Sequence, residues 1–216
     1  MPLTGSADAG YFDAMSDRYL IPSATHRVTD TIKKSQFITT LAHTPDIESA
    51  REFVASIKEE FPDATHNCWA FAAGPPGDTA AVGMSDDGEP HGTAGKPMLT
   101  TLLHSSVGEV SAVVTRYFGG TKLGTGGLVR AYSGMVNLGL ESLPTKEKVD
   151  TTTITATIPY PAVTLFKRML PEFEAEVEEE RFTDEAAFVL VIPNEHLASF
   201  TDKLAELTDG VGRVEI

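Results

Sequence analysis

The sequence predicts an α+β protein of two domains, and three observations support this fold class. Strand and helix patterns are mixed over residues 21–143, a polar segment typical of a linker follows at 144–150, and residues 149–216 show the order β-α-β-β-α-β. That order is the ferredoxin-like split unit. With 216 residues, the chain is long enough for each domain to bury a core of its own.

The first elements are an arm, a hairpin and a helix. Residues 1–20 are expected to form a weakly ordered arm with a short helix at 11–17. In "HRVTDTIKKSQFITTLAHT", two strands flank a polar turn at 33–35. Apolar residues recur at helical spacing in "TPDIESAREFVASIKEEFP", and we expect Thr44 to cap this helix, with Pro45 in its first position.

A second hairpin, a helix, a buried strand and another helix complete the predicted first domain. "HNCWAFAAG" and "TAAVGMS" are typical of strands joined by the turn "GPPGD". "KPMLTTLLHSS" favours a helix, and the valine-rich "EVSAVVTRYF" favours a buried strand. A glycine-rich loop then becomes a helix near Gly126.

The predicted second domain has the simpler pattern. Strands at "TTTITATIPY", "EAEVEEERFT", "AAFVLVIP" and "GRVEI" are interrupted by helices at "PAVTLFKRML" and "NEHLASFTDKLAELTDG". The second of these helices turns Leu197, Phe200, Leu204 and Leu207 inward and stops before Gly210. The acidic run "EAEVEEERFTDE" is interpreted as a solvated strand and hairpin.

Charge is distributed unevenly along this acidic chain. The formal net charge is −14, which disfavours broad, non-specific coating of nucleic acid. Residues 149–216 hold five Lys and Arg against 14 Asp and Glu, whereas residues 90–148 hold six against three. The middle segment is therefore a basic island.

Cysteine content and hydropathy indicate the compartment. Cys68 is the single cysteine, so no internal disulfide is possible, as is usual in a reducing cytoplasm. The first residues lack the basic start and apolar core of a secretory signal, and no apolar run is long enough to span a membrane. We expect a cytoplasmic protein with no membrane partner, and nothing indicates DNA as a partner.

Two glycine-rich segments, "SDDGEPHGTAGKP" and "TRYFGGTKLGTGGLVRAY", each precede a predicted helix. A helix N-terminus offers free N–H groups to an anion, and glycine lets the backbone approach it closely. Lys96, Arg116, Lys122 and Arg130 would add positive charge. The segments therefore predict a shared phosphate or carboxylate site, or else glycines that only permit tight turns and close packing.

A second candidate site combines the carboxylates of Asp86, Asp87 and Glu89 with His91 and His66. Such a group of carboxylates can hold Mg²⁺ or Ca²⁺, or supply a general acid and base. The spacing matches no metal motif, and the alternative is a turn whose acids cap helices and pair with nearby Lys and Arg.

His66 and Cys68 are two residues apart on a predicted strand, so they could share a face. A Cys–His nucleophile needs that contact and a third, orienting group. The favoured interpretation is that Cys68 is a small buried side chain.

The segments "SDDGEPHGTAGKPML" and "VVTRYFGGTKLGTGGLVRAY", preceded by "KKSQFI" and "ATHNCWAF", resemble the YigZ/IMPACT family in its bacterial two-domain branch. The resemblance implies that residues 21–143 form a domain similar to the second domain of small-subunit ribosomal protein five. It also implies that residues 149–216 are ferredoxin-like, similar to the fifth and last domain of elongation factor G.

The resemblance implies a role in translational control. Eukaryotic members relieve the starvation-activated initiation-factor kinase by competing for its co-activator. The same segments add further residues of interest, which are Ser85, Gly88, Pro90, Gly92, Thr93, Ala94, Gly95, Thr115, Phe118 and Leu123. The predicted ligand- or anion-binding site comprises His66, Asp86, Asp87, Glu89, His91, Lys96, Arg116, Tyr117, Gly119, Gly120, Lys122, Gly124, Gly126, Gly127 and Arg130. No catalytic residue, metal ligand or cofactor is assigned.

Three functions follow, of which the first is favoured. In the first, the chain is a translation-associated regulator that binds RNA, the ribosome or a translation-related protein through the cleft between the glycine segments. Alternatively, it is an enzyme acting on a phosphorylated small molecule or nucleotide, with Mg²⁺ on the acidic group. A scaffold without a ligand gains support if the loop carboxylates are fully paired within the protein.

Overall fold

The computed structural model describes residues 18–216. The described chain forms two compact units, one spanning Tyr19–Lys148 and the other containing Val149–Ile216. The α+β fold class and the two-domain organisation predicted from the sequence are confirmed. The predicted helix at 11–17 lies outside the described residues, and the last three residues of the predicted arm belong to a strand.

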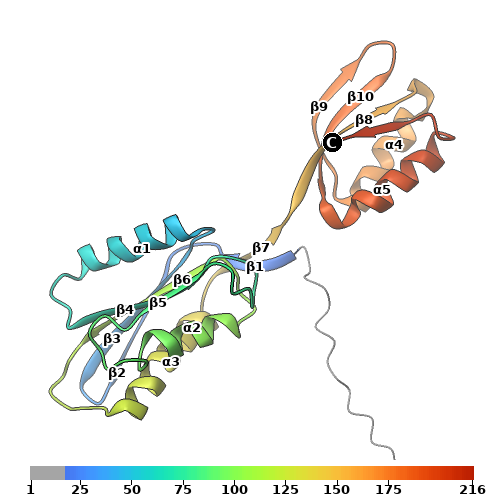
Figure 1. Cartoon of the computed structure of the whole chain (residues 1–216). Helices are drawn as coiled ribbons and strands as arrows, with labels where there is room; N and C mark the ends of the chain where they lie inside the picture. The colour runs from blue at the N-terminus through green and yellow to red at the C-terminus, as the bar shows by residue number, and fades with distance from the viewer. Residues whose placement is uncertain (1–17) are drawn as a thin grey trace, which may run out of the picture. The chain divides into compact units, whose positions relative to one another are not determined.

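The first unit is built on an antiparallel sheet with the strand order β2-β3-β6-β4-β5 (Figure 1). The hairpin β2–β3 closes through Lys33 and Lys34, both with positive φ, which matches the twist of a two-residue hairpin turn. The central strand β6 is valine-rich and almost wholly buried, as predicted. The five strands are β2 (His26–Ile32), β3 (Ser35–His43), β4 (His66–Ala72), β5 (Val82–Ser85) and β6 (Val110–Tyr117).

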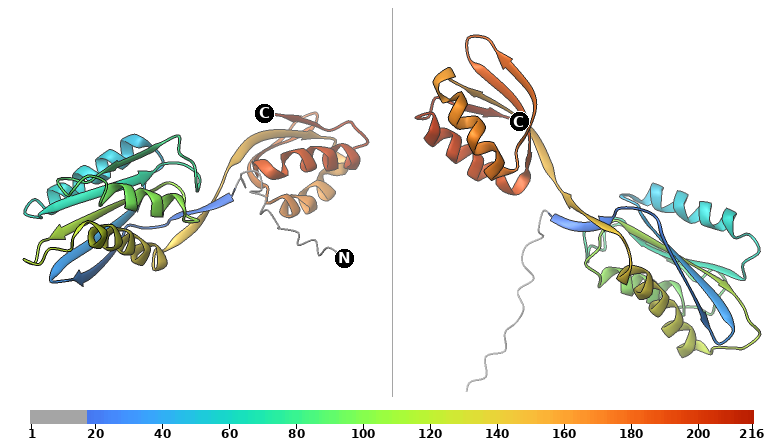
Figure 2. Two further views of the ribbon diagram at one scale, coloured as in Figure 1. Left: turned by 60° about the horizontal axis from the view of Figure 1, so that its bottom comes forward. Right: turned by 180° about the vertical axis from the view of Figure 1, so that it is seen from behind.

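Helices cover both faces of this sheet, with α1 (Ile47–Glu60) on one and α2 (Gly95–Leu103) and α3 (Thr125–Glu141) on the other (Figures 1 and 2). The main core lies between the sheet and the α2/α3 layer. It includes the fully buried rings of Phe37 and Tyr132, which meet edge to face. This layer brings the start of α3 beside the end of β6.

The cap of α1 differs from the predicted one. Asp46, not Thr44, is the N-cap: its carboxylate accepts from the backbone N–H of Ser49 at 2.8 Å, and Ser49 Oγ accepts in return. This is a capping box. Thr44 is buried, and its hydroxyl bonds Ser111 at 2.7 Å.

The segment predicted as a linker is a strand. β7 (Thr145–Val149) pairs with β1 (Arg18–Pro22) in a two-stranded sheet. The polar sequence "PTKEKVD" does not predict this strand, because a short exposed two-stranded ribbon needs no alternation of apolar and polar residues.

The second unit has the predicted β-α-β-β-α-β order, with a four-stranded sheet ordered β11-β8-β10-β9. Phe166, Phe188 and Phe200 are fully buried between sheet and helices. All seven residues of β9 are exposed, in agreement with the solvated interpretation of the acidic run. The elements are β8 (Thr151–Ile158), α4 (Val163–Met169), β9 (Glu176–Phe182), β10 (Ala186–Pro193), α5 (Asn194–Leu207) and β11 (Arg213–Glu215).

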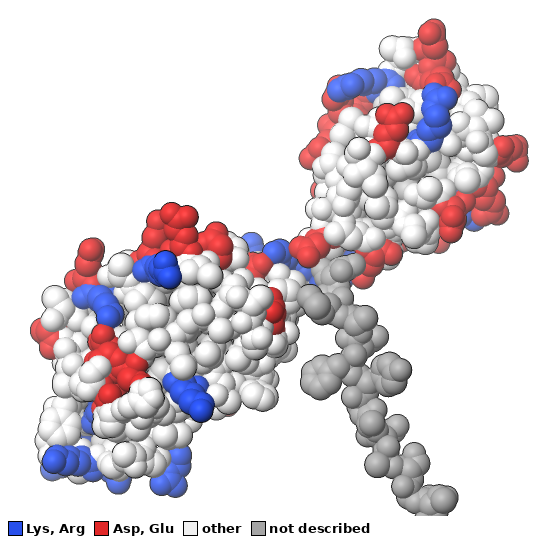
Figure 3. Space-filling view, viewed as in Figure 1, with Lys and Arg blue, Asp and Glu red and all other residues white. Residues whose placement is uncertain are grey.

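Acidic side chains are scattered over the second unit, and blue side chains gather at the end of the first unit where α3 begins (Figure 3). The predicted likenesses to a ribosomal protein domain and an elongation factor domain remain predictions. No helix in residues 18–216 has the length and apolar character needed to cross a membrane.

Candidate functional site

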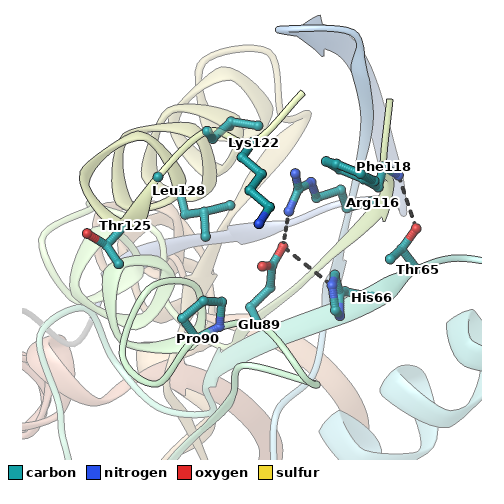
Figure 4. A pocket seen from close by; sticks show the side chains of 11 residues that line it. Thr65, His66, Glu89, Pro90, Arg116, Phe118, Lys122, Thr125 and Leu128 are labelled. Carbon is teal, nitrogen blue, oxygen red and sulfur yellow. Dashed lines mark hydrogen bonds and ion pairs between the residues drawn. The ribbon is translucent and has the colours of Figure 1, made fainter. Parts of the chain in front are cut away.

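A cavity of about 450 Å³ lies at the start of α3, in the Tyr19–Lys148 unit (Figure 4). Both glycine-rich segments contribute to its wall, as does the start of β4. Its lining consists of Thr65, His66, Glu89, Pro90, Arg116, Phe118, Lys122, Leu123, Gly124, Thr125 and Leu128.

Strand register sets the back of the cavity. Phe37 on β3 and His66 on β4 are both direct partners of Arg116 on β6. Directly opposed residues in a sheet project from the same face, so the three side chains lie side by side. The Arg116 guanidinium sits 5.4 Å from the ring centroids of both Phe37 and Phe118. Phe37 is fully buried, whereas Phe118 is 46% exposed.

Glu89 and Arg116 form a buried ion pair at the wall of the cavity. Their side chains are only 4% and 5% exposed, and Arg116 Nη1 donates to Glu89 Oε1 at 2.5 Å. The Tyr132 hydroxyl donates to the same oxygen at 2.8 Å. Burial raises the pKa of Tyr132, so the phenol remains a neutral donor. A buried carboxylate persists when it is paired and hydrogen-bonded in this way.

His66 is held in one orientation by the acidic loop. Its Nδ1 lies 2.9 Å from the carbonyl oxygen of Asp87, which can only accept, so Nδ1 carries the proton in the neutral ring. Nε2 is then an acceptor, and it lies 3.8 Å from Glu89 Oε1. His66 therefore supports the wall of the cavity, with its Nε2 beside Glu89.

The start of α3 supplies the positive side of the cavity. Gly124 precedes the helix with φ +76°, a conformation that favours glycine, and no side chain of the described residues caps the first turn. The N–H groups of that turn are thus available to an anion. Lys122 is exposed and extends into the cavity above Glu89 (Figure 4), without an ion-pair partner among residues 18–216.

Asp86 organises the first glycine loop instead of lining the cavity. Its carboxylate accepts from the backbone N–H groups of Gly92 at 2.7 Å, Ala94 at 2.9 Å and Gly95 at 2.8 Å. Burial acts to raise the pKa of Asp86, but the three N–H groups outweigh it, and the pKa lies below its ordinary value. Asp86 thereby caps the start of α2, although it lies several residues before that helix in the sequence.

Asp87 is also engaged elsewhere. It accepts from Lys58 Nζ at 2.6 Å and from the backbone N–H of Asn67 at 2.7 Å. Burial raises its pKa, and these two donors more than compensate, so the pKa of Asp87 is lowered. Within the described part of the chain, no three His, Cys, Asp or Glu side chains are grouped closely enough to hold a metal ion.

The other predicted site residues lie around the cavity and do not line it. Tyr117 donates to Asp63, Arg130 bonds the carbonyl of Gly126, and His91 and Lys96 are exposed on the acidic loop and α2. Gly119 is required for packing, because a methyl group there would lie 1.8 Å from the carbonyl oxygen of Lys34. The lining does not include Gly120, Gly126 or Gly127.

Sequence analysis missed Thr65, Thr125 and Leu128 in the lining, and Tyr132 behind it. Leu128 and Tyr132 are four residues apart on α3, so helical spacing from the glycine loop could have identified their shared face. Thr65 carries no comparable signal; its hydroxyl accepts from the Phe118 N–H at 3.0 Å.

Cys68 is expected to resist thiol reagents in the folded protein. The side chain is fully buried, with Sγ 2.9 Å from the carbonyl of Asp86, and burial raises the pKa of the thiol to about 12. Only about one molecule in 10⁴ would carry a thiolate at pH 8. Reaction with a disulfide reagent should be slow in buffer and fast in 6 M guanidinium; equal rates would contradict this assignment.

Family comparisons match both units of the chain. Residues 33–140 match the model described as the Impact N-terminal domain, and residues 157–211 match a domain of unknown function, DUF1949. IMPACT family member YigZ of Escherichia coli is 47% identical over 90% of this chain and 95% of its own length. IMPACT family member YvyE of Bacillus subtilis is 35% identical over 83% and 82%.

Among solved structures, the crystal structure of a hypothetical protein is 44% identical to this chain, with a TM-score of 0.64. The match covers 91% of this chain and 96% of that one.

Proposed function

This chain belongs to the IMPACT family, and from that premise we propose that it is a translation-associated, cytoplasmic protein that binds RNA. The RNA ligand enters the cavity at the start of α3. Membership of the family supports a role in translation, and the geometry of the cavity supports RNA as the ligand.

One observation carries the proposal: a cation, a free helix N-terminus and a half-exposed aromatic ring face the same cavity. Lys122 and the first turn of α3 suit a phosphate group. Phe118 offers a ring at the rim on which a base can stack, as in other proteins that bind single-stranded nucleic acid. This combination favours RNA over a simple anion.

The charge of the whole chain restricts where RNA can bind. With a formal net charge of −14, most of the surface repels phosphate. Binding should therefore be confined to the end of the first unit where basic side chains gather (Figure 3).

The alternative, a Mg²⁺-dependent enzyme, receives less support from the geometry. That enzymatic function requires Asp86, Asp87 and Glu89 to bind one Mg²⁺ ion together. Asp86 is committed to three backbone N–H groups and Asp87 to Lys58 and Asn67. Only Glu89 reaches the cavity.

Charge reversal at Lys122 is expected to abolish salt-sensitive association with ribosomes. The Lys122→Glu variant places a carboxylate where the phosphate binds, so co-sedimentation at low salt should fall to background. Lys96→Glu is the matched control, because Lys96 is exposed in the first turn of α2 and does not line the cavity.

Two outcomes of this experiment would contradict the proposal. Wild-type protein that fails to pellet with ribosomes even at low salt would remove the basis for ribosomal RNA as a ligand. Equal losses in Lys122→Glu and Lys96→Glu would show that association depends on net charge and not on the cavity.

A further inference from the structure

One oxygen of the buried Glu89 has no hydrogen-bond partner within the described part of the chain, and it faces the cavity. Arg116 Nη1, the Tyr132 hydroxyl and His66 Nε2 all lie closest to Oε1. Among residues 18–216, no side chain or backbone group hydrogen-bonds Oε2. Figure 4 shows this second oxygen turned away from Arg116 and His66, toward the space between Lys122, Pro90 and Leu128.

An acceptor in this position requires a donor from the ligand. Glu89 is 8% exposed and lines the cavity, so a ligand that fills the cavity displaces water from Oε2 and leaves this acceptor unsatisfied unless the ligand supplies a donor. The oxygen lies in a cavity whose opposite side suits a phosphate. The ligand therefore carries an anionic group and, a short distance away, an N–H donor.

We propose that Glu89 Oε2 accepts a hydrogen bond from the exocyclic amino group of an RNA base, so that the cavity selects cytosine or adenine against uracil. This inference rests on the proposed function, and it identifies Glu89 as a residue that determines specificity. Carboxylates recognise the N4 amino group of cytosine in the same manner in nucleic-acid complexes.

Uracil is disfavoured because it presents the O4 acceptor where cytosine and adenine present an amino donor. With the phosphate at the start of α3 and the base stacked on Phe118, the O4 carbonyl of uracil would face Glu89 Oε2. Two acceptors would then meet without a proton between them. A site built around a hydrogen bond rejects the analogue that lacks the donor more strongly than a site built on apolar contact.

The arrangement around Glu89 predicts an inversion of this preference in Glu89→Gln. Arg116 and Tyr132 both donate to the Oε1 position, so the glutamine carbonyl is held there. Its amide NH₂ then occupies the Oε2 position and becomes a donor toward the cavity. That donor suits the O4 carbonyl of uracil and opposes the N4 amino group of cytosine.

The test is fluorescence anisotropy of the full chain with labelled oligocytidine and oligouridine octamers at low salt. Wild-type protein is expected to bind oligocytidine about tenfold more tightly, and Glu89→Gln is expected to favour oligouridine. Thermal unfolding checks that Glu89→Gln is folded. An octamer of N4,N4-dimethylcytidine keeps the base but lacks the N–H donor; with wild-type protein it should bind about as weakly as oligouridine, whether or not the variant folds.

Failure of this inference is distinguishable from failure of the proposed function. If both octamers bind wild-type protein equally, or if dimethylation leaves affinity unchanged, Glu89 does not read the base and the inference is wrong, although RNA binding stands. If neither octamer binds, the proposed function is wrong as well.

Discussion

Replacing Arg116 with methionine is expected to lower the free energy of unfolding by about 3–5 kcal/mol. The substitution removes the cation that pairs with Glu89, whose side chain is only 4% exposed. The aliphatic stem is retained between Phe37 and Phe118, so the loss comes mainly from an uncompensated buried carboxylate. Urea unfolding followed by circular dichroism measures the change as a lower midpoint at constant slope.

A double-mutant cycle provides the control for this effect. Arg116→Met/Glu89→Leu removes both charges, and it should be more stable than Arg116→Met alone, because apolar groups of similar volume often replace a buried pair at little cost. If the two substitutions are additive, Glu89 and Arg116 are not energetically coupled and the account of the cavity wall is wrong.

Replacing Asp86 with alanine is expected to cost about 3 kcal/mol of stability, because three backbone N–H groups lose their acceptor. Two of these, on Ala94 and Gly95, belong to the start of α2, so hydrogen exchange should increase there first. Asp86→Asn keeps one acceptor oxygen, and its loss should be smaller. Unchanged exchange in α2 of Asp86→Ala would contradict the capping role.

The same carboxylate predicts a pH dependence. The pKa of Asp86 is lower in the folded protein than in the unfolded chain. Its contribution to stability is therefore fully present above the unfolded value of about 4, and it is lost as pH falls through the lower folded value. The stability difference between wild type and Asp86→Asn should be constant above about pH 5 and narrow below about pH 4.

The architecture was largely predictable, because it depends on local periodicity. The β-α-β-β-α-β order of the second unit and the buried strand β6 follow from apolar spacing that the sequence displays directly. The cap of α1 was not predicted, because threonine and aspartate are both good N-cap residues. Thr44 does not cap the helix because its hydroxyl bonds Ser111 instead, and Asp46 takes the N-cap position. β7 was missed because its partner β1 is far away in sequence.

The candidate site was predictable as a region but not as a set of contacts. The glycine segments and the basic island indicated the region in which the structure places the cavity. The separate structural roles of the three acidic residues could not be predicted, because Asp86, Asp87 and Glu89 look equivalent in "SDDGEP". Their roles depend on partners distant in sequence, such as Lys58 for Asp87 and Arg116 for Glu89.

The measurement that tests the central claim most directly is the salt dependence of oligocytidine binding, by anisotropy, for wild type and Lys122→Glu. The account predicts measurable binding at low salt that weakens as salt rises. It also predicts that Lys122→Glu binds less tightly, with a slope of log affinity against log salt reduced by about one. Absence of binding at low salt, or a variant with wild-type affinity and slope, would contradict the assignment of this cavity to an RNA phosphate.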